Sequence, residues 1–138
     1  MDFVLDASVA AAWVLDDEQS DLADQVIDSL AFKTATAPHL WALEIANILT
    51  VCERRGRIDA AKRKLMAEAL RDLGVIEQAL TQAAVFGEIM DLAAKHTLSS
   101  YDASYLELAM RLGVPLATLD KPLQTAAEAE RVALVKAI

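Results

Sequence analysis

Two short apolar segments of this chain each end in an aspartate, and longer helical segments separate them. The segment FVL at residues 3–5 is followed by Asp6, and the segment PLATL at residues 115–119 is followed by Asp120. Three further short apolar segments lie near Thr36, at 75–77 and at 132–135. Short buried strands that alternate with longer helices are typical of a mainly parallel sheet covered by helices. We therefore expect one α/β domain over residues 1–138.

Capping residues and glycines give the expected bounds of the helices. Pro38 suits the first turn of a helix that ends at Gly56, and Asp59 suits the start of the next helix. Thr81 and either Ser99 or Ser100 would cap two later helices. The expected helices span about 8–15, 16–32, 38–55, 60–73, 82–96, 100–112 and 121–130.

The charge balance limits how the chain could bind nucleic acid. Thirteen basic residues against 21 acidic ones give a net charge of −8, so no general positive field attracts phosphate. A local basic group, a partner or a bound divalent cation would have to supply positive charge. Arg54, Arg55, Arg57 and residues 62–64 form the main basic cluster, which we interpret as a solvated face.

Two further observations bear on the compartment. The single cysteine, Cys52, can form neither an internal disulfide nor a zinc site, which fits a reducing cytoplasm. The amino-terminal stretch has early acids and no basic leader, so we expect neither a signal peptide nor a membrane span.

Asp6 and Asp120 are the first two candidate site residues. The carboxyl ends of parallel strands lie at one edge of a sheet, where ligands bind in open α/β folds. Both acids therefore face the same rim. Taken singly, each has a simpler interpretation as the cap of the helix or turn that follows it.

Glu44 is the third candidate. At helical spacing it lies within an apolar stripe formed by Leu40, Ile48 and Val51, where an unpaired carboxylate is costly. An arginine, a hydrogen-bond network, a proton or a metal must compensate it. Asn47, three residues on, could orient it; the alternative is a buried salt bridge.

Asp102 is the fourth candidate, since Leu98, Tyr105 and Leu106 surround it at helical spacing. Its place in the first turn of a helix also gives it the simpler interpretation of a helix-start acid. Four carboxylates brought together would raise at least one pKa sharply unless a cation compensated them. An oxygen-only site of this kind favours Mg²⁺ or Mn²⁺ over zinc.

Three segments of the chain resemble the PIN-domain family, and within it the VapC-type toxins of toxin–antitoxin pairs. They are FVLDASV around Asp6, PHLWALEIANIL around Glu44, and LSSYDASYLELAMRLGVPLATLD around Asp102 and Asp120, followed by KPLQTAA. The likeness spans residues 3 to about 127, and the third segment is the most specific. Residues 57–96 carry no recognisable motif.

The resemblance implies a three-layer α/β/α sandwich around a parallel five-stranded sheet. It implies a Mg²⁺- or Mn²⁺-dependent endoribonuclease in which Asp6 and Asp102 hold the metal directly. Glu44 and Asp120 would act through waters or on a second ion, with Ser8 and Asn47 in support. It also implies RNA products with 5′-phosphate ends, a homodimer, and a cognate antitoxin that covers the site.

Several alternatives stay open beside this interpretation. The chain could be a catalytically silent binding or regulatory module of the same fold, or a solitary PIN-domain nuclease without an antitoxin. A receiver domain or a haloacid-dehalogenase-type phosphatase fits poorly, because Asp6 is followed by Ala7 and Ser8 where those folds need a second acid.

Overall fold

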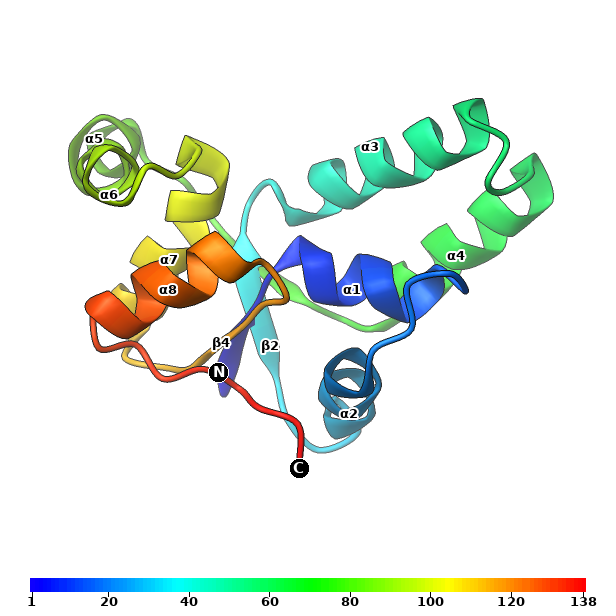
Figure 1. The fold of residues 1–138 in the computed structure, drawn as a ribbon, viewed down its shortest axis with the longest axis horizontal. Helices are drawn as coiled ribbons and strands as arrows, with labels where there is room; N and C mark the ends of the chain where they lie inside the picture. Colours follow the sequence, from blue (N-terminus) through cyan, green and yellow to red (C-terminus); the bar gives the residue numbers. More distant parts are fainter.

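A four-stranded parallel sheet forms the centre of the computed structural model, which describes residues 1–138 (Figure 1). The strands are β1 (Phe3–Leu5), β2 (Ala35–Pro38), β3 (Ile76–Gln78) and β4 (Leu116–Ala117). They lie in the order β3-β2-β1-β4, and every neighbouring pair is parallel. All four carboxyl ends therefore lie at the same edge of the sheet.

The prediction of a full fifth strand is wrong, because only a single bridge forms there. The segment 132–135 lies beside β4, but it pairs through a single bridge between Leu134 and Leu116. Backbone hydrogen bonds of 2.9 Å and 3.0 Å join Leu116 to Ala133 and Val135. Because β4 has only two residues, it offers no room for a longer ladder.

Helices cover both faces of the sheet, which confirms the three-layer α/β/α sandwich. Figure 1 shows the first four helices on one side of the sheet and the later ones on the other. The first group is α1 (Ala7–Val14), α2 (Asp21–Ser29), α3 (Trp41–Arg54) and α4 (Ala60–Asp72). The second is α5 (Gln82–Ala84), the π-helical η1 (Val85–Ile89), α6 (Met90–His96), α7 (Ser100–Leu112) and α8 (Lys121–Ala129).

Three predicted helix caps are confirmed. The side chains of Asp59, Thr81 and Ser99 each accept a hydrogen bond from a backbone N–H in the first turn of α4, α5 and α7. Each bond satisfies a donor that the helix itself leaves free. Of the two serines considered for α7, Ser99 is the cap.

Two predicted helix starts are wrong. Pro38 is the last residue of β2, paired with Gln78, and α3 begins only at Trp41. The acids 16–18 precede α2 instead of starting it, because the hydroxyl of Ser20 accepts from the backbone N–H of Ala23 and caps that helix. Residues 16–18 thus belong to a loop between α1 and α2.

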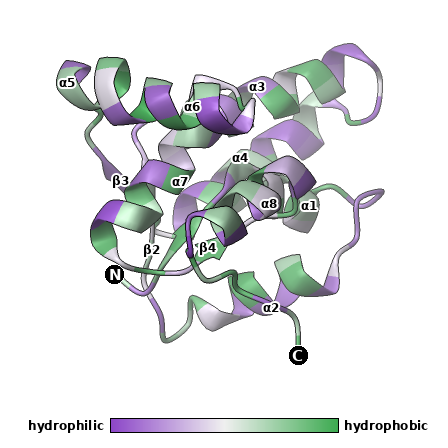
Figure 2. Cartoon of the chain, turned by 60° about the vertical axis from the view of Figure 1, so that its left-hand side comes forward, coloured by the Kyte–Doolittle hydropathy of each residue, from purple (hydrophilic) through white to green (hydrophobic).

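Small and branched apolar side chains fill the core. Figure 2 shows hydrophobic and hydrophilic stretches alternating along the helices. Alanines of α1 are buried at Ala7, Ala10 and Ala11, which lets that helix pack closely. On the opposite face, Tyr105 and Leu106 of α7 are fully buried. No helix combines the length and the apolar character that a membrane crossing requires.

Candidate active site

Asp6 and Asp120 meet at the carboxyl edge of the sheet, as the strand pattern predicts. Asp6 directly follows β1, and Asp120 follows β4 after two residues. In the register of these neighbouring strands, Leu5 lies opposite Ala117. The backbone N–H of Asp6 donates to the carbonyl of Ala117 at 2.9 Å, so the two acidic segments are held together.

A hydroxyl network fixes the carboxylate of Asp6. Its Oδ2 accepts from Ser8 Oγ at 2.6 Å and from Thr118 Oγ1 at 2.7 Å. These hydroxyls in turn accept from the backbone N–H groups of Leu119 and Asp120, both at 3.0 Å. Asp6 is only 4% exposed, so its direction is set by the fold.

The capping interpretations of these two acids have different outcomes. Asp6 occupies the position before α1, but its side chain makes no capping hydrogen bond, so that interpretation is wrong. Asp120 does cap α8, since its Oδ2 accepts from the backbone N–H of Leu123 at 3.0 Å. Its other carboxylate oxygen makes no hydrogen bond and stays available to a ligand.

Glu44 lies in the first turn of α3 and is half-buried. The predicted place within the apolar stripe is partly wrong, because α3 buries Trp41, Ile45 and Leu49 and Glu44 lies beside them. The compensating group is Tyr105 of α7, whose hydroxyl donates to Glu44 Oε1 at 2.6 Å. The side chain of Asn47 is exposed and makes no hydrogen bond within the protein.

Asp102 is half-buried in the first turn of α7. Its backbone N–H donates to the capping hydroxyl of Ser99 at 3.0 Å. Its carboxylate has no partner in the protein. The helix dipole favours an anion here, so the helix-start interpretation and a ligand role are compatible.

Burial is the largest cause that raises the pKa of Asp6. Repulsion from Asp102 and Asp120 raises this pKa further, whereas the hydrogen bonds from Ser8 and Thr118 lower it. The carboxyl groups at the end of β1, at the end of β4 and on α7 are therefore close enough to repel one another.

The carboxyl groups of Glu44 and Asp102 behave similarly. Partial burial raises the pKa of Glu44, and Asp6 and Asp102 repel it, against the hydrogen bond from Tyr105. Partial burial also raises the pKa of Asp102, and Asp120 repels it. No lysine or arginine contributes to any of these three pKa values. The site is an uncompensated patch of negative charge.

The four acids do not form a finished metal cage. No three carboxylate, histidine or cysteine side chains are gathered tightly enough to constitute one. This agrees with like charges that repel without a cation between them. A site that binds an ion partly through water does not need a complete set of protein ligands.

The sequence analysis did not predict two residues that hold the carboxylates of the site in place. Thr118 is buried and bonds to Asp6 from a segment 112 residues away in the sequence. Tyr105 reaches Glu44 across 61 residues. The only sequence signal for Tyr105 is its helical spacing from Asp102, which also fits a core tyrosine.

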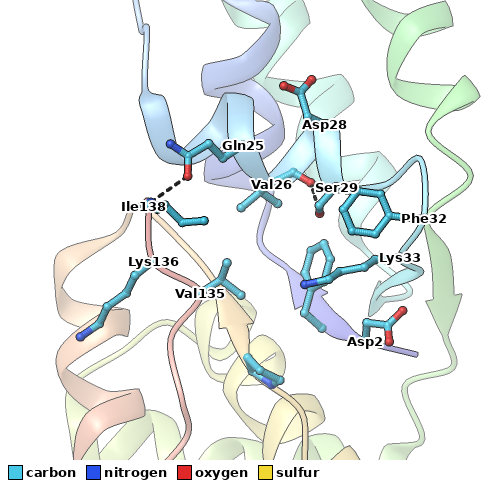
Figure 3. Close-up of a pocket in the computed structure, with 12 residues that line it drawn as sticks. Asp2, Gln25, Val26, Asp28, Ser29, Phe32, Lys33, Val135, Lys136 and Ile138 are labelled. Carbon is cyan, nitrogen blue, oxygen red and sulfur yellow. Dashed lines mark hydrogen bonds between the residues drawn. The ribbon is translucent and has the colours of Figure 1, made fainter.

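A cavity of about 440 Å³ lies at the opposite edge of the sheet, between α2 and the carboxyl-terminal segment (Figure 3). Asp2 and Pro115, which precede β1 and β4, place it at the amino ends of the strands. Its polar groups are used structurally: Asp2 accepts from the N–H of Thr34, and Gln25 accepts from that of Ile138. Asp28 lines it without a hydrogen-bond partner, but Lys33 and Lys136 line the same cavity, so this edge does not gather uncompensated carboxylates as the carboxyl edge does.

Comparisons with known proteins point in the same direction. A model of the PIN domain family matches residues 3–129. Ribonuclease VapC3 of Pyrobaculum aerophilum is 35% identical over 123 residues, which cover 89% of this chain and 92% of that protein. Ribonuclease VapC9 of Mycobacterium tuberculosis is 35% identical over 127 residues, which cover 92% of both. The crystal structure of FitAcB from Neisseria gonorrhoeae shares the fold, with a TM-score of 0.68 and 19% identity over 97% of this chain and 96% of that one.

Proposed function

The chain belongs to the PIN-domain family, and from this membership we propose that it is a VapC-type endoribonuclease with Asp6, Glu44, Asp102 and Asp120 as its active site. It is the toxin component of a toxin–antitoxin pair. It hydrolyses phosphodiester bonds of RNA and leaves 5′-phosphate ends.

The mutual repulsion of these carboxyl groups is the observation that carries the proposed site. Three of them have raised pKa values, and no basic side chain offsets any of the three. A fold does not gain stability by gathering uncompensated acids at one edge of its sheet. The arrangement is understandable if a cation from solution completes it.

The chemistry of the donor set fits Mg²⁺ or Mn²⁺. All four side chains offer oxygen and none offers nitrogen or sulfur, which is the ligand type that these ions prefer. Asp6 and Asp102 would hold the ion directly, with Glu44 and Asp120 acting through waters or on a second ion. When bound, the ion supplies positive charge for the phosphate and lowers the pKa of a water molecule.

The chain's own residues orient this site. Ser8 and Thr118 hold the carboxylate of Asp6, and Tyr105 holds that of Glu44. Asn47, one helical turn from Glu44, is exposed and free to support a ligand through its amide.

Each histidine contacts an acid that is not part of the proposed site. His39 lies 3.6 Å from the carboxylate of Glu77, and His96 bonds to Glu130 at 2.6 Å. The four carboxylates are therefore the groups that can accept a proton from an attacking water.

Partners and compartment belong to the same proposal. The toxin would be held inactive by a separate antitoxin protein that covers the carboxyl edge of the sheet. It would act in the cytoplasm, where its RNA substrate and a reducing environment are found, consistent with the unpaired, buried Cys52.

A homodimer is proposed from the exposed apolar surface. Leu43 of α3 and Phe86 of η1 are 76% and 72% exposed, which is unusual for side chains of this size. Sedimentation velocity should give twice the mass of the chain. The variant Leu43→Glu/Phe86→Glu should sediment as a monomer, and a monomeric wild type at micromolar concentration would contradict this part.

Cleavage of total RNA tests the proposed function. Purified, antitoxin-free protein is incubated with Mn²⁺ or with EDTA, beside the variants Asp6→Asn and Asp24→Asn. Asp24 is an exposed acid of α2 and serves as the matched control. We expect discrete fragments with 5′-phosphate ends that need both the metal and Asp6, and that persist in the control variant.

The same assay separates the alternatives. Equal activity of Asp6→Asn would place the chemistry outside the proposed site. A folded protein that binds Mn²⁺ but leaves all RNA intact would favour a silent binding module. Cleavage by a protein with no antitoxin encoded beside its gene would favour a solitary nuclease.

A further inference from the structure

A groove of about 660 Å³ leads from the proposed active site toward the loop between α1 and α2. Ser8 and Asp120 line it at the catalytic end, and Glu18, Gln19 and Ser20 line it where the loop runs into α2. Side chains of α1 and α3 lie between them. A strand of nucleotides bound at Asp120 could continue along this groove.

The loop at the far end of this groove carries negative charge. Residues 16–18 are Asp-Asp-Glu, and all three are exposed; Glu18 lines the groove, and Asp16 and Asp17 directly precede it. Each phosphate of an RNA strand is an anion, and charges within about 10 Å of one another interact at ordinary salt. Left unpaired, these acids would repel the strand.

Basic side chains from the α3–α4 region pair with all three acids. Arg57 makes a forked contact with Asp17, with Nη2 at 2.8 Å and 2.9 Å from its two oxygens and Nε at 3.2 Å. The same guanidinium lies 3.5 Å from Glu18, and Lys62 lies 3.5 Å from Asp16. Two parallel N–H donors to one carboxylate fix the orientation of the ion pair as well as neutralising its charge.

Arg57 also connects the loop to the core. Its Nη1 donates to Cys52 Sγ at 3.4 Å, and Cys52 is buried in α3. The guanidinium therefore joins a fixed point of α3 to a loop that has no regular structure of its own. Of the two basic side chains that pair with the loop, Arg57 is the one that also contacts a buried residue of α3.

We propose that Arg57 is a positioning residue for RNA: it holds residues 16–18 in place and neutralises them, so that the strand can lie in the groove beside Asp120. This inference rests on the proposed function, because it takes RNA as the substrate. Arg57 touches neither the substrate nor the metal. It acts through the loop.

Binding of RNA, measured apart from cleavage, tests the inference. The probe is a fluorescein-labelled single-stranded RNA of mixed sequence with 2′-O-methyl riboses, followed by anisotropy in Mg²⁺. Arg57→Ala should raise the Kd about fivefold at low salt, as expected when an exposed ion-pair network is removed beside an anion. The increase should shrink at high salt.

A second-site variant distinguishes this role from a general loss of structure. Asp17→Asn in the Arg57→Ala background removes one of the freed charges, so the Kd should return to within about twofold of the wild type. Arg63→Ala is the matched control, since Arg63 of α4 pairs with Glu53 of α3 and lines a different pocket. Its Kd should not change.

Three results would overturn the inference: no change of Kd in Arg57→Ala, no recovery in the double variant, or no binding of RNA by the wild type. A wild type that binds the probe but cleaves no RNA with Mn²⁺ would refute the nuclease activity. The inference about Arg57 would then still be decided by the Kd values.

Discussion

The hydroxyl of Tyr105 offers a sharp test of how the site is held. It is fully buried and donates to Glu44 Oε1 at 2.6 Å. The substitution Tyr105→Phe removes one oxygen and leaves the ring in place. Since this hydrogen bond lowers the pKa of Glu44, its loss should raise that pKa further.

The magnitude follows from the burial of the two partners. A hydrogen bond to a charged group contributes about 1.5–3 kcal/mol. Water can reach the half-buried Glu44 and replace the lost donor, so we expect the free energy of unfolding to fall by only about 1.5 kcal/mol. Loss of a hydrogen bond that orients a metal ligand typically weakens metal binding about 10- to 100-fold. We expect the lower value, about tenfold, because Glu44 is proposed to act through water.

Two measurements check this prediction. The Mg²⁺ concentration that gives half-maximal RNA cleavage should rise about tenfold. The acid limb of the pH–rate profile should move to higher pH, because a carboxyl group with a higher pKa loses its proton later. Tyr101→Phe, an exposed tyrosine one turn earlier on α7, should change neither. An unaltered Mg²⁺ dependence in Tyr105→Phe would refute the role given to Glu44.

Three further predictions concern the Asp6 network. Asp6→Asn should reduce cleavage at least about 100-fold and raise the free energy of unfolding of the metal-free protein by about 1 kcal/mol at pH 7, measured in urea, since it removes a buried, repelled charge. Because burial raises the folded-state pKa of Asp6 above its ordinary 3.8, the wild type regains stability as the pH falls through that raised value. The gain in the free energy of unfolding from Asp6→Asn should therefore shrink toward acid pH. Mg²⁺ should shrink the same gain at neutral pH. Thr118→Val should lower the free energy of unfolding by about 1–3 kcal/mol, since it removes one of the two hydroxyls that donate to the buried carboxylate of Asp6 and leaves the N–H of Asp120 without its acceptor. Thr125→Val, at an exposed position of α8, should cost no more than about 0.5 kcal/mol in the same assay.

The strand pattern was sufficient to place Asp6 and Asp120 at the same edge of the sheet, but it did not give the order of the strands. Parallel strands share a carboxyl edge, so two acids that follow apolar strands must approach if the strands are neighbours. The structure makes β1 and β4 neighbours. Their catalytic role is still a prediction, which Asp6→Asn tests.

Local patterns could not supply the long-range partners. The contact between Tyr105 and Glu44 joins residues 61 apart, and nothing near either residue specifies the other. The bounds of β2 also depend on tertiary context: Pro38 alone suits a helix start, but its pairing with Gln78 extends the strand. The segment 132–135 has the composition of a strand, yet the two residues of β4 give it a single bridge.

The order of the strands also governs when the enzyme can become active during its synthesis. β1, made first, lies between β2 and β4, and β4 is the last strand to leave the ribosome. Asp120 follows β4, and one of the two hydroxyls that orient Asp6 belongs to Thr118, directly after the same strand. A nascent chain that has not reached residue 118 therefore contains Asp6 and Ser8 without Thr118 and Asp120. If Asp120 belongs to the active site as proposed, a nascent toxin cannot cut RNA before β4 and Asp120 have been synthesised and have packed beside β1. A partner protein then has that period of synthesis in which to be ready.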